Sequence, residues 1–175
     1  MEWQDLLSEG YDRALVEVEH VLEGLKYEDL IWQPRPDCNS IGWLAWHLAR
    51  QQDAAIAYLM RQDQLWIKDG WHMKFNRAAD PEDIGTGHTP EDVAAFKPPD
   101  VDTLIDYHRA VLERSKTYFN TLSSKDLDRV VNIKWLPPLT TLGTYLVIVM
   151  AESIQHAGQM GYVRGIRYGM GWQKY

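Results

Sequence analysis

Apolar residues recur at three- and four-residue steps in four long segments, and polar residues occupy the positions between them. The first segment covers about residues 3–25, and the second begins near Ile41. The third runs over about residues 101–122, and the fourth runs from Thr140 or Thr141 to about Arg167. Four amphipathic helices of this length, with no convincing sheet, predict an all-α fold, a four-helix bundle.

The connection over residues 62–100 is irregular, with several Gly and Pro breakers. It also carries large side chains, such as Trp66 and Trp71, which are unusual in a plain linker. Thr89 followed by Pro90 predicts a short helix there. We therefore expect a long ordered loop between the second and third helices, packed over one end of the bundle.

Two shorter segments also carry local signals. Residues 32–40 contain two prolines, which exclude helix, and Asn39 or Ser40 is expected to cap the second helix. Residues 130–138 alternate weakly between apolar and polar side chains, which predicts a short hairpin.

Length and composition narrow the class of protein. A chain of 175 residues predicts a single domain over 1–175. The net charge of -7 disfavours nucleic acid as a partner. The lone Cys38 cannot form an internal disulfide, and we find neither a signal peptide nor an apolar run long enough to cross a membrane. We therefore expect a cytoplasmic protein that acts on a small-molecule substrate, with no membrane partner.

Three polar residues share the predicted inner face of the fourth helix: Glu152, His156 and Gln159. A buried carboxylate is costly unless it is paired or coordinates a metal ion. Glu152 and His156 are four residues apart, so they lie on one face and can hold the same ion. Gln159 lies about one turn further on and can orient a ligand or a bound water.

A third ligand would come from the second helix, where His47 lies at the edge of the apolar stripe. Two histidines and one carboxylate leave open positions on a metal ion, as in catalytic sites. The same ligand set suits zinc, nickel or ferrous iron. The alternative is a metal-free buried polar group of Glu152, His156 and Gln159, and the residues alone leave both interpretations open.

Other residues near these helices have two interpretations each. His108 lies on the apolar stripe of the third helix. It is either an acid or base near the metal, or an extra ligand, or, as we favour, a hydrogen-bonded core residue. Trp43 precedes His47 by one turn and either walls a pocket or packs in a core or dimer interface. His72 and His88 could reach the rim of the site, although solvated loop positions are favoured. Apolar residues on both sides of the second helix suggest a homodimer.

Two stretches of the chain resemble motifs of the DinB/YfiT-like superfamily. Residues 39–50 (NSIGWLAWHLAR) resemble its second-helix motif, and residues 151–165 (AESIQHAGQMGYVRG) resemble its fourth-helix motif. Residues 87–93 (GHTPEDV) and 135–138 (WLPP) are similar to segments common in one subgroup. The matches are spread over most of the chain.

The resemblance implies a four-helix bundle with a metal ion on three inward side chains, which correspond here to His47, Glu152 and His156. Some members have His where this chain has Glu152, whereas the mycothiol-dependent maleylpyruvate isomerase branch has Glu. This chain lacks the length for the extra C-terminal domain of that isomerase, so we do not expect isomerase activity.

The family that the chain resembles includes transferases that use low-molecular-weight thiols of the mycothiol and bacillithiol type. A metal ion suits that chemistry because it lowers the pKa of a bound thiol. The resemblance therefore implies a divalent-metal-dependent enzyme, either a thiol S-transferase or a related hydrolase, of unknown substrate. The alternative is a non-catalytic stress-response protein that binds a metal or ligand on the same scaffold.

Overall fold

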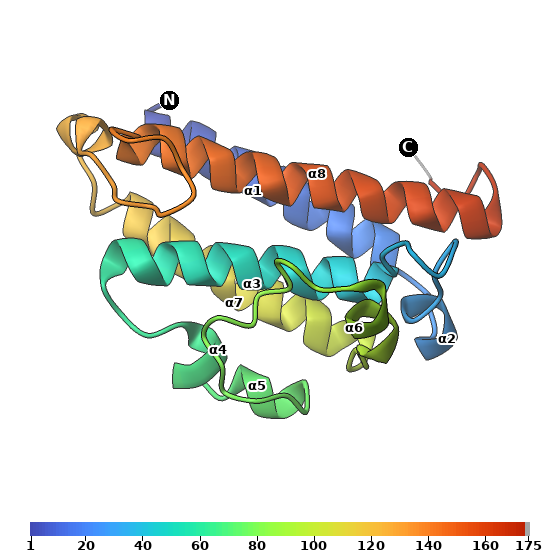
Figure 1. Ribbon diagram of the computed structural model, residues 1–175. Coiled ribbons are helices and arrows are strands. Elements are labelled where there is room, and N and C mark those ends of the chain that lie inside the picture. Colours follow the sequence, from blue (N-terminus) through green and yellow to red (C-terminus); the bar gives the residue numbers. More distant parts are fainter. Residues whose placement is uncertain (174–175) are drawn as a thin grey trace.

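The computed structural model describes residues 1–173, and four long helices dominate it (Figure 1). They are α1 (Trp3–Leu22), α3 (Ile41–Met60), α7 (Val101–Phe119) and α8 (Leu142–Tyr168). The four pack into a bundle, so the predicted all-α four-helix fold is confirmed.

Each long helix lies against two others, in the cyclic order α1, α8, α3, α7. Figure 1 shows that α1 and α8 run in one direction, whereas α3 and α7 run in the other. Ion pairs between α1 and α7 fit this arrangement, because Glu19 pairs with Arg109 and Asp12 pairs with Lys116. The helices α3 and α8, which carry the three predicted ligands, are adjacent and antiparallel.

Polar caps fix where three of the long helices begin. Ser40 accepts a hydrogen bond from the backbone nitrogen of Trp43, as expected for the start of α3. Asp100 caps α7 and Thr141 caps α8 in the same way. These caps satisfy backbone N–H groups that have no partner within the helix.

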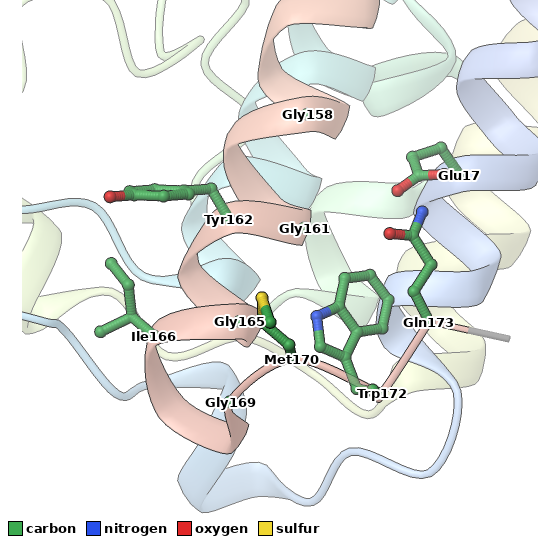
Figure 2. Close-up of a pocket in the computed structure, with 11 residues that line it drawn as sticks. Glu17, Gly158, Gly161, Tyr162, Gly165, Ile166, Gly169, Met170, Trp172 and Gln173 are labelled. Atoms are coloured by element: carbon green, nitrogen blue, oxygen red, sulfur yellow. The ribbon is translucent and has the colours of Figure 1, made fainter.

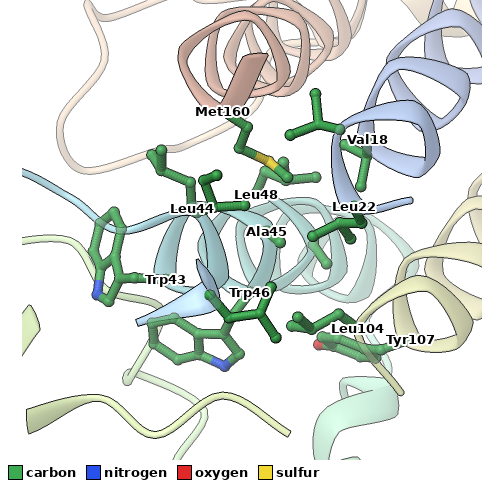
Figure 3. Close-up of a cluster of buried hydrophobic side chains, with 14 of the residues drawn as sticks. Val18, Leu22, Trp43, Leu44, Ala45, Trp46, Leu48, Leu104, Tyr107 and Met160 are labelled. Atoms are coloured by element: carbon green, nitrogen blue, oxygen red, sulfur yellow. The ribbon is translucent and has the colours of Figure 1, made fainter. Parts of the chain in front are cut away.

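The helix α3 is buried on nearly every side. Figure 3 shows Leu44 and Leu48 packed toward Met160 of α8, while Trp43 and Trp46 lie on the other side of α3. The second side is covered by the connection over residues 62–100. The apolar stripe of α3 is wider than a single helix contact needs. For this reason α3 is the most enclosed of the four long helices.

That connection is ordered, as predicted, and contains α4 (Leu65–Lys68), α5 (Trp71–Lys74) and α6 (Pro90–Ala95). Thr89 caps α6, which confirms the predicted short helix. The predicted position over one end of the bundle was wrong, because the connection lies along the flank of α3 and α7 (Figure 1).

Two buried charges in the middle of α3 hold the connection on that flank. Asp53 accepts hydrogen bonds from the backbone nitrogens of Leu65 (3.0 Å) and Trp66 (2.9 Å). Arg50, which is fully buried, donates to the carbonyl oxygens of residues 80, 81 and 83. Its guanidinium group also lies 4.5 Å from the Trp66 ring centroid.

The remaining short elements are α2 (Tyr27–Leu30) and the 3-10 helix η1 (Ser124–Asp128). The hairpin predicted over residues 130–138 was wrong, since only an isolated antiparallel bridge between Val130 and Thr141 forms there. The two prolines of this segment lack the N–H groups that a ladder needs. Over residues 1–173 we find no helix with the length and apolar character to cross a membrane.

Candidate functional site

The antiparallel packing of α3 and α8 brings His47 and His156 together. Their ring centroids are 4.8 Å apart, and the ring planes meet at 75°. His47 is 5% exposed, whereas the side chain of His156 is 15% exposed, so the pair lies at the edge of the bundle rather than at its centre.

The contacts of His47 determine which ring nitrogen is free. Its Nδ1 contacts the carbonyl oxygen of Ile84, and a carbonyl oxygen only accepts hydrogen bonds. Nδ1 therefore carries the hydrogen, and Nε2 keeps its lone pair. Trp43 stacks on the same ring at 4.6 Å and fixes its plane, so the predicted neighbour of His47 is in contact with it.

Burial lowers the pKa of His47 to about 4, and this effect outweighs the hydrogen bond to Ile84, which raises the pKa. The nearby His156 and His88 also lower it. At neutral pH the imidazole is therefore uncharged, which is the form that coordinates a metal ion.

His156 has a matching arrangement on α8. Its Nδ1 lies 2.8 Å from Oε1 of Gln159, so Nδ1 donates to this oxygen and Nε2 is left for another partner. That Nε2 lies 3.4 Å from Oε2 of Glu152. A nitrogen lone pair and a carboxylate oxygen repel each other, so a contact of this kind calls for a proton or a cation between the two atoms. His156 is thus in contact with both Glu152 and Gln159.

The side chain of Glu152 is 42% exposed and Gln159 is exposed, so the predicted inner-face position of these two residues was wrong. The buried polar group of the metal-free interpretation is therefore not buried. The core-facing residues of this part of α8 are Ser153, Ala157 and Met160. Glu152 lies beside that face, where water can solvate it. The cost of burying a lone charge is therefore no argument for a metal ion at Glu152.

In residues 1–173, no group of three or more His, Cys, Asp or Glu side chains stands close enough together to hold a metal ion as it is. His47 and His156 are adjacent, and Glu152 contacts His156, so the three predicted ligands are neighbours rather than a closed cage. A shared ion would require the side chain of Glu152 to turn toward both rings. Its partial exposure leaves room for that change.

Sequence reasoning missed Gln51, whose Nε2 lies 3.3 Å from Nε2 of His47 and 3.4 Å from Oγ1 of Thr86. The amide N–H donates to the free lone pair of His47. Gln51 follows His47 by one helical turn, so the four-residue spacing could have identified it.

The loop that covers His47 was also missed. Gly85 has a φ of +89°, and a Cβ atom built on it would lie 2.7 Å from Nδ1 of His47. Only glycine fits so close to the ring in this backbone conformation. No local sequence signal links this glycine to a histidine on a distant helix.

His88 lies beneath this loop, and the favoured solvated position for it was wrong. Its Nδ1 accepts from Nε1 of Trp43 (3.1 Å), and its Nε2 donates to Oδ1 of Asp83 (3.1 Å). His88 therefore helps to hold Trp43 against His47. His72 contacts the carbonyl oxygen of Arg77 and the ring of Trp66, away from this pair.

His108 lies in the core, 1% exposed, and we favoured this position. The expected hydrogen bond is missing, because neither ring nitrogen has a partner within the described residues. Burial lowers the pKa of His108 to about 4. No contact in residues 1–173 links its ring to His47 or His156.

Three hollows lie along α3 or α8, and neither His47 nor His156 lines any of the three. One of about 620 Å³ reaches Gln159 and also contains Cys38. Another, of about 550 Å³, reaches Gln51 and Ile84. A third, of about 700 Å³, lies beside the second half of α8, where Trp172 packs near Gly161 (Figure 2). Of the three, only the first two include residues that hydrogen-bond to the histidines.

The fold and these contacts define a four-helix bundle with a pair of histidines between two adjacent helices. The chain belongs to the DinB superfamily, whose sequence profile matches residues 11–160. The chain is also similar to a solved structure described as the conserved protein of locus from Enterococcus faecalis, with 32% sequence identity. That similarity covers 95% of this chain and 97% of the other, with a TM-score of 0.86. A search of the curated proteins found no significant match.

Proposed function

We propose that the protein binds one divalent metal ion on His47, Glu152 and His156, and that it is an enzyme that depends on this ion. The main supporting observation is that both histidines donate Nδ1–H to a carbonyl oxygen, so that on each of two adjacent rings Nε2 is the nitrogen left to bind an ion. Metal-ligating histidines commonly have this second hydrogen bond, since it fixes the tautomer and orients the ring. Zinc, nickel and ferrous iron are the candidate ions.

The residues of the chain have distinct roles in this proposal. Burial keeps His47 neutral, and Trp43 keeps water from one face of its ring. Gln159 holds the Nδ1 hydrogen of His156. Glu152 supplies a negative charge that offsets part of the charge of the cation. The hollows that reach Gln51 and Gln159 leave space for a thiol and for a second small molecule.

The favoured reaction is transfer of a low-molecular-weight thiol of the mycothiol or bacillithiol type to an electrophile; hydrolysis is the related alternative. A divalent cation lowers the pKa of a thiol or water that coordinates to it. In the transfer, the thiol loses its proton, its sulfur forms a bond to the electrophilic carbon, and the leaving group departs with the electron pair of the broken bond. The reaction needs no oxidant or reductant.

The first test is metal content by elemental mass spectrometry on tag-free protein. We expect about one equivalent of zinc, nickel or iron per chain in the wild type and little in His156→Ala. His20→Ala is the matched control, because His20 is an exposed histidine at the end of α1. If the wild type holds no metal even after dialysis against zinc and nickel, the metal proposal is wrong. The contact between His156 and Glu152 is then explained by a shared proton.

The second test measures activity. Metal-loaded protein, bacillithiol or mycothiol, and 1-chloro-2,4-dinitrobenzene are mixed, and release of chloride is followed. We expect turnover that is lost with chelator and in His156→Ala. Stoichiometric metal without turnover across a panel of thiols, electrophiles and esters would favour the non-catalytic binding protein instead.

A further inference from the structure

The hollow of about 550 Å³ lies along α3 and begins at Gln51, which contacts His47. Its floor includes Gln51, Ala54 and Tyr58, which follow His47 at steps of four, seven and eleven residues. Positions with these spacings lie along one stripe of a helix. Through Gln51 and Ile84, one end of the hollow is therefore next to His47. The volume of the hollow is in the range of small-molecule sites.

Two connections form its walls. Residues 62–84 form one, which ends at Ile84, the residue that contacts His47. Residues 132–135 form the other, and the hydroxyl of Tyr58 donates to the carbonyl oxygen of Asn132 (2.8 Å), which holds this wall to α3. The site is thus built from one rigid helix and two segments tied to it.

Trp135 is the most notable residue of the second wall. It is 66% exposed, although its ring meets that of Tyr145 edge to face at 6.3 Å. An exposed indole at the mouth of a hollow gives a flat apolar surface on which a ring can stack. Tyr58, Ile133 and Tyr145 extend this apolar surface inward.

The charges around the hollow disfavour an anionic ligand. Asp63, Glu82 and Lys134 line it, and none of the three forms an ion pair within residues 1–173. Acidic groups outnumber the single basic group, so the field does not attract a carboxylate or phosphate. At the end of the hollow nearest to His47, the polar group is the uncharged amide of Gln51.

We propose that this pocket binds a neutral, planar, largely apolar small molecule, with its ring against Trp135 and its polar end at Gln51. The inference rests on the proposed function, because we take this molecule to be the second substrate, which reacts beside the histidine pair. The Gln51 amide donates to the lone pair of His47 that the proposal assigns to the metal ion. When a metal ion occupies that lone pair, the Gln51 amide N–H is free to donate to the small molecule.

The test uses two probes that differ mainly in charge, 2-naphthol and 2-naphthoate, with binding measured by titration calorimetry. We expect 2-naphthol to bind more tightly. Trp135→Ala should weaken binding of 2-naphthol roughly tenfold, the loss of about one aromatic contact. Ala54→Phe should block the pocket. Leu139→Ala is the matched control, because Leu139 is exposed on the same connection but does not line the pocket.

Added zinc should tighten the binding of 2-naphthol in the wild type but not in Gln51→Ala. If zinc fails to bind while 2-naphthol still requires Trp135, the proposed function fails and the pocket stands. If zinc binds but Trp135→Ala and Ala54→Phe leave 2-naphthol binding unchanged, the pocket inference is wrong and the metal site stands. A dimer that Trp135→Ala converts to monomer, with no effect on the probe, would instead assign Trp135 to a subunit contact.

Discussion

His47 on α3 and His156 on α8 are 109 positions apart in the sequence, and their rings meet edge to face with centroids 4.8 Å apart. Each ring donates Nδ1–H to a carbonyl oxygen from its own surroundings, Ile84 for one and Gln159 for the other. The Nε2 atoms of the two rings are the basis of the predictions that concern a metal ion.

Zinc should stabilise the wild-type protein against heat. An ion that binds only the folded state at one hundred times its dissociation constant adds about 2.7 kcal/mol to the free energy of unfolding. We expect His47→Ala and His156→Ala to lose this increase, whereas His20→Ala keeps it. Differential scanning calorimetry with and without zinc is the measurement. An equal increase in all four proteins would assign the zinc to another place.

Gly85→Ala should disturb His47 through the loop. A Cβ atom there would lie 2.7 Å from Nδ1 of His47, so the loop must shift and the contact with Ile84 weakens. We expect metal affinity to fall about 10- to 100-fold, as when other outer hydrogen bonds of metal sites are lost.

Gly87→Ala is the control for backbone strain. Gly87 has a similar φ of +84°, but a Cβ atom on it would meet nothing within 4 Å. Both substitutions should lower the free energy of unfolding by about 1–3 kcal/mol, and only Gly85→Ala should change zinc affinity. Equal zinc affinity in the two variants would show that the loop does not orient His47.

His108 makes the folded protein sensitive to acid. Burial lowers its pKa from 6.5 to about 4, so between these values the unfolded chain binds more protons than the folded one. Stability from this group is therefore complete above pH 6.5 and falls as pH drops toward 4. The loss is about 2 kcal/mol at pH 5.

Replacement of His108 by leucine removes this titration and both unpartnered nitrogens. We expect His108→Leu to be at least as stable as the wild type at pH 7.5 and more stable at pH 5. Urea unfolding at both pH values gives the difference. The same pH dependence in wild type and variant would indicate that His108 has a hydrogen-bond partner that keeps its pKa near 6.5.

Asp53 should be the most sensitive buried charge. Its carboxylate accepts from two backbone nitrogens of the 62–100 connection and from the hydroxyl of Tyr107, and it lies 3.7 Å from Arg50. Asp53→Asn keeps the shape but removes the negative charge beside a fully buried guanidinium. We expect a loss of about 3–5 kcal/mol in the free energy of unfolding.

The control for this substitution is Asp37→Asn, since Asp37 pairs with Arg35 on the exposed surface. Exposed ion pairs add little to stability, so this variant should unfold close to the wild type. Chemical denaturation of both variants is the measurement. A small effect of Asp53→Asn would mean that the carbonyl oxygens around Arg50 are enough to compensate its charge.

The sequence by itself determined the four helices and the residues that begin them. Apolar spacing reports the angle of each residue around a helix axis, and caps such as Ser40 and Thr141 act on their own backbone within three residues. The same local information placed Glu152, His156 and Gln159 together, because i, i+3 and i, i+4 contacts lie within one helix.

Only the tertiary structure decided how deep these residues lie and what covers them. The position of a residue around its helix axis does not show how much of it the neighbouring helices cover. The sequence therefore predicted a buried Glu152, although its side chain is 42% exposed. The carbonyl of Ile84 on His47, and the hollow between two connections, depend on backbone that is distant in sequence. Such contacts are set by the packing of α3 against the connection through Arg50 and Asp53, and a local pattern carries no record of them.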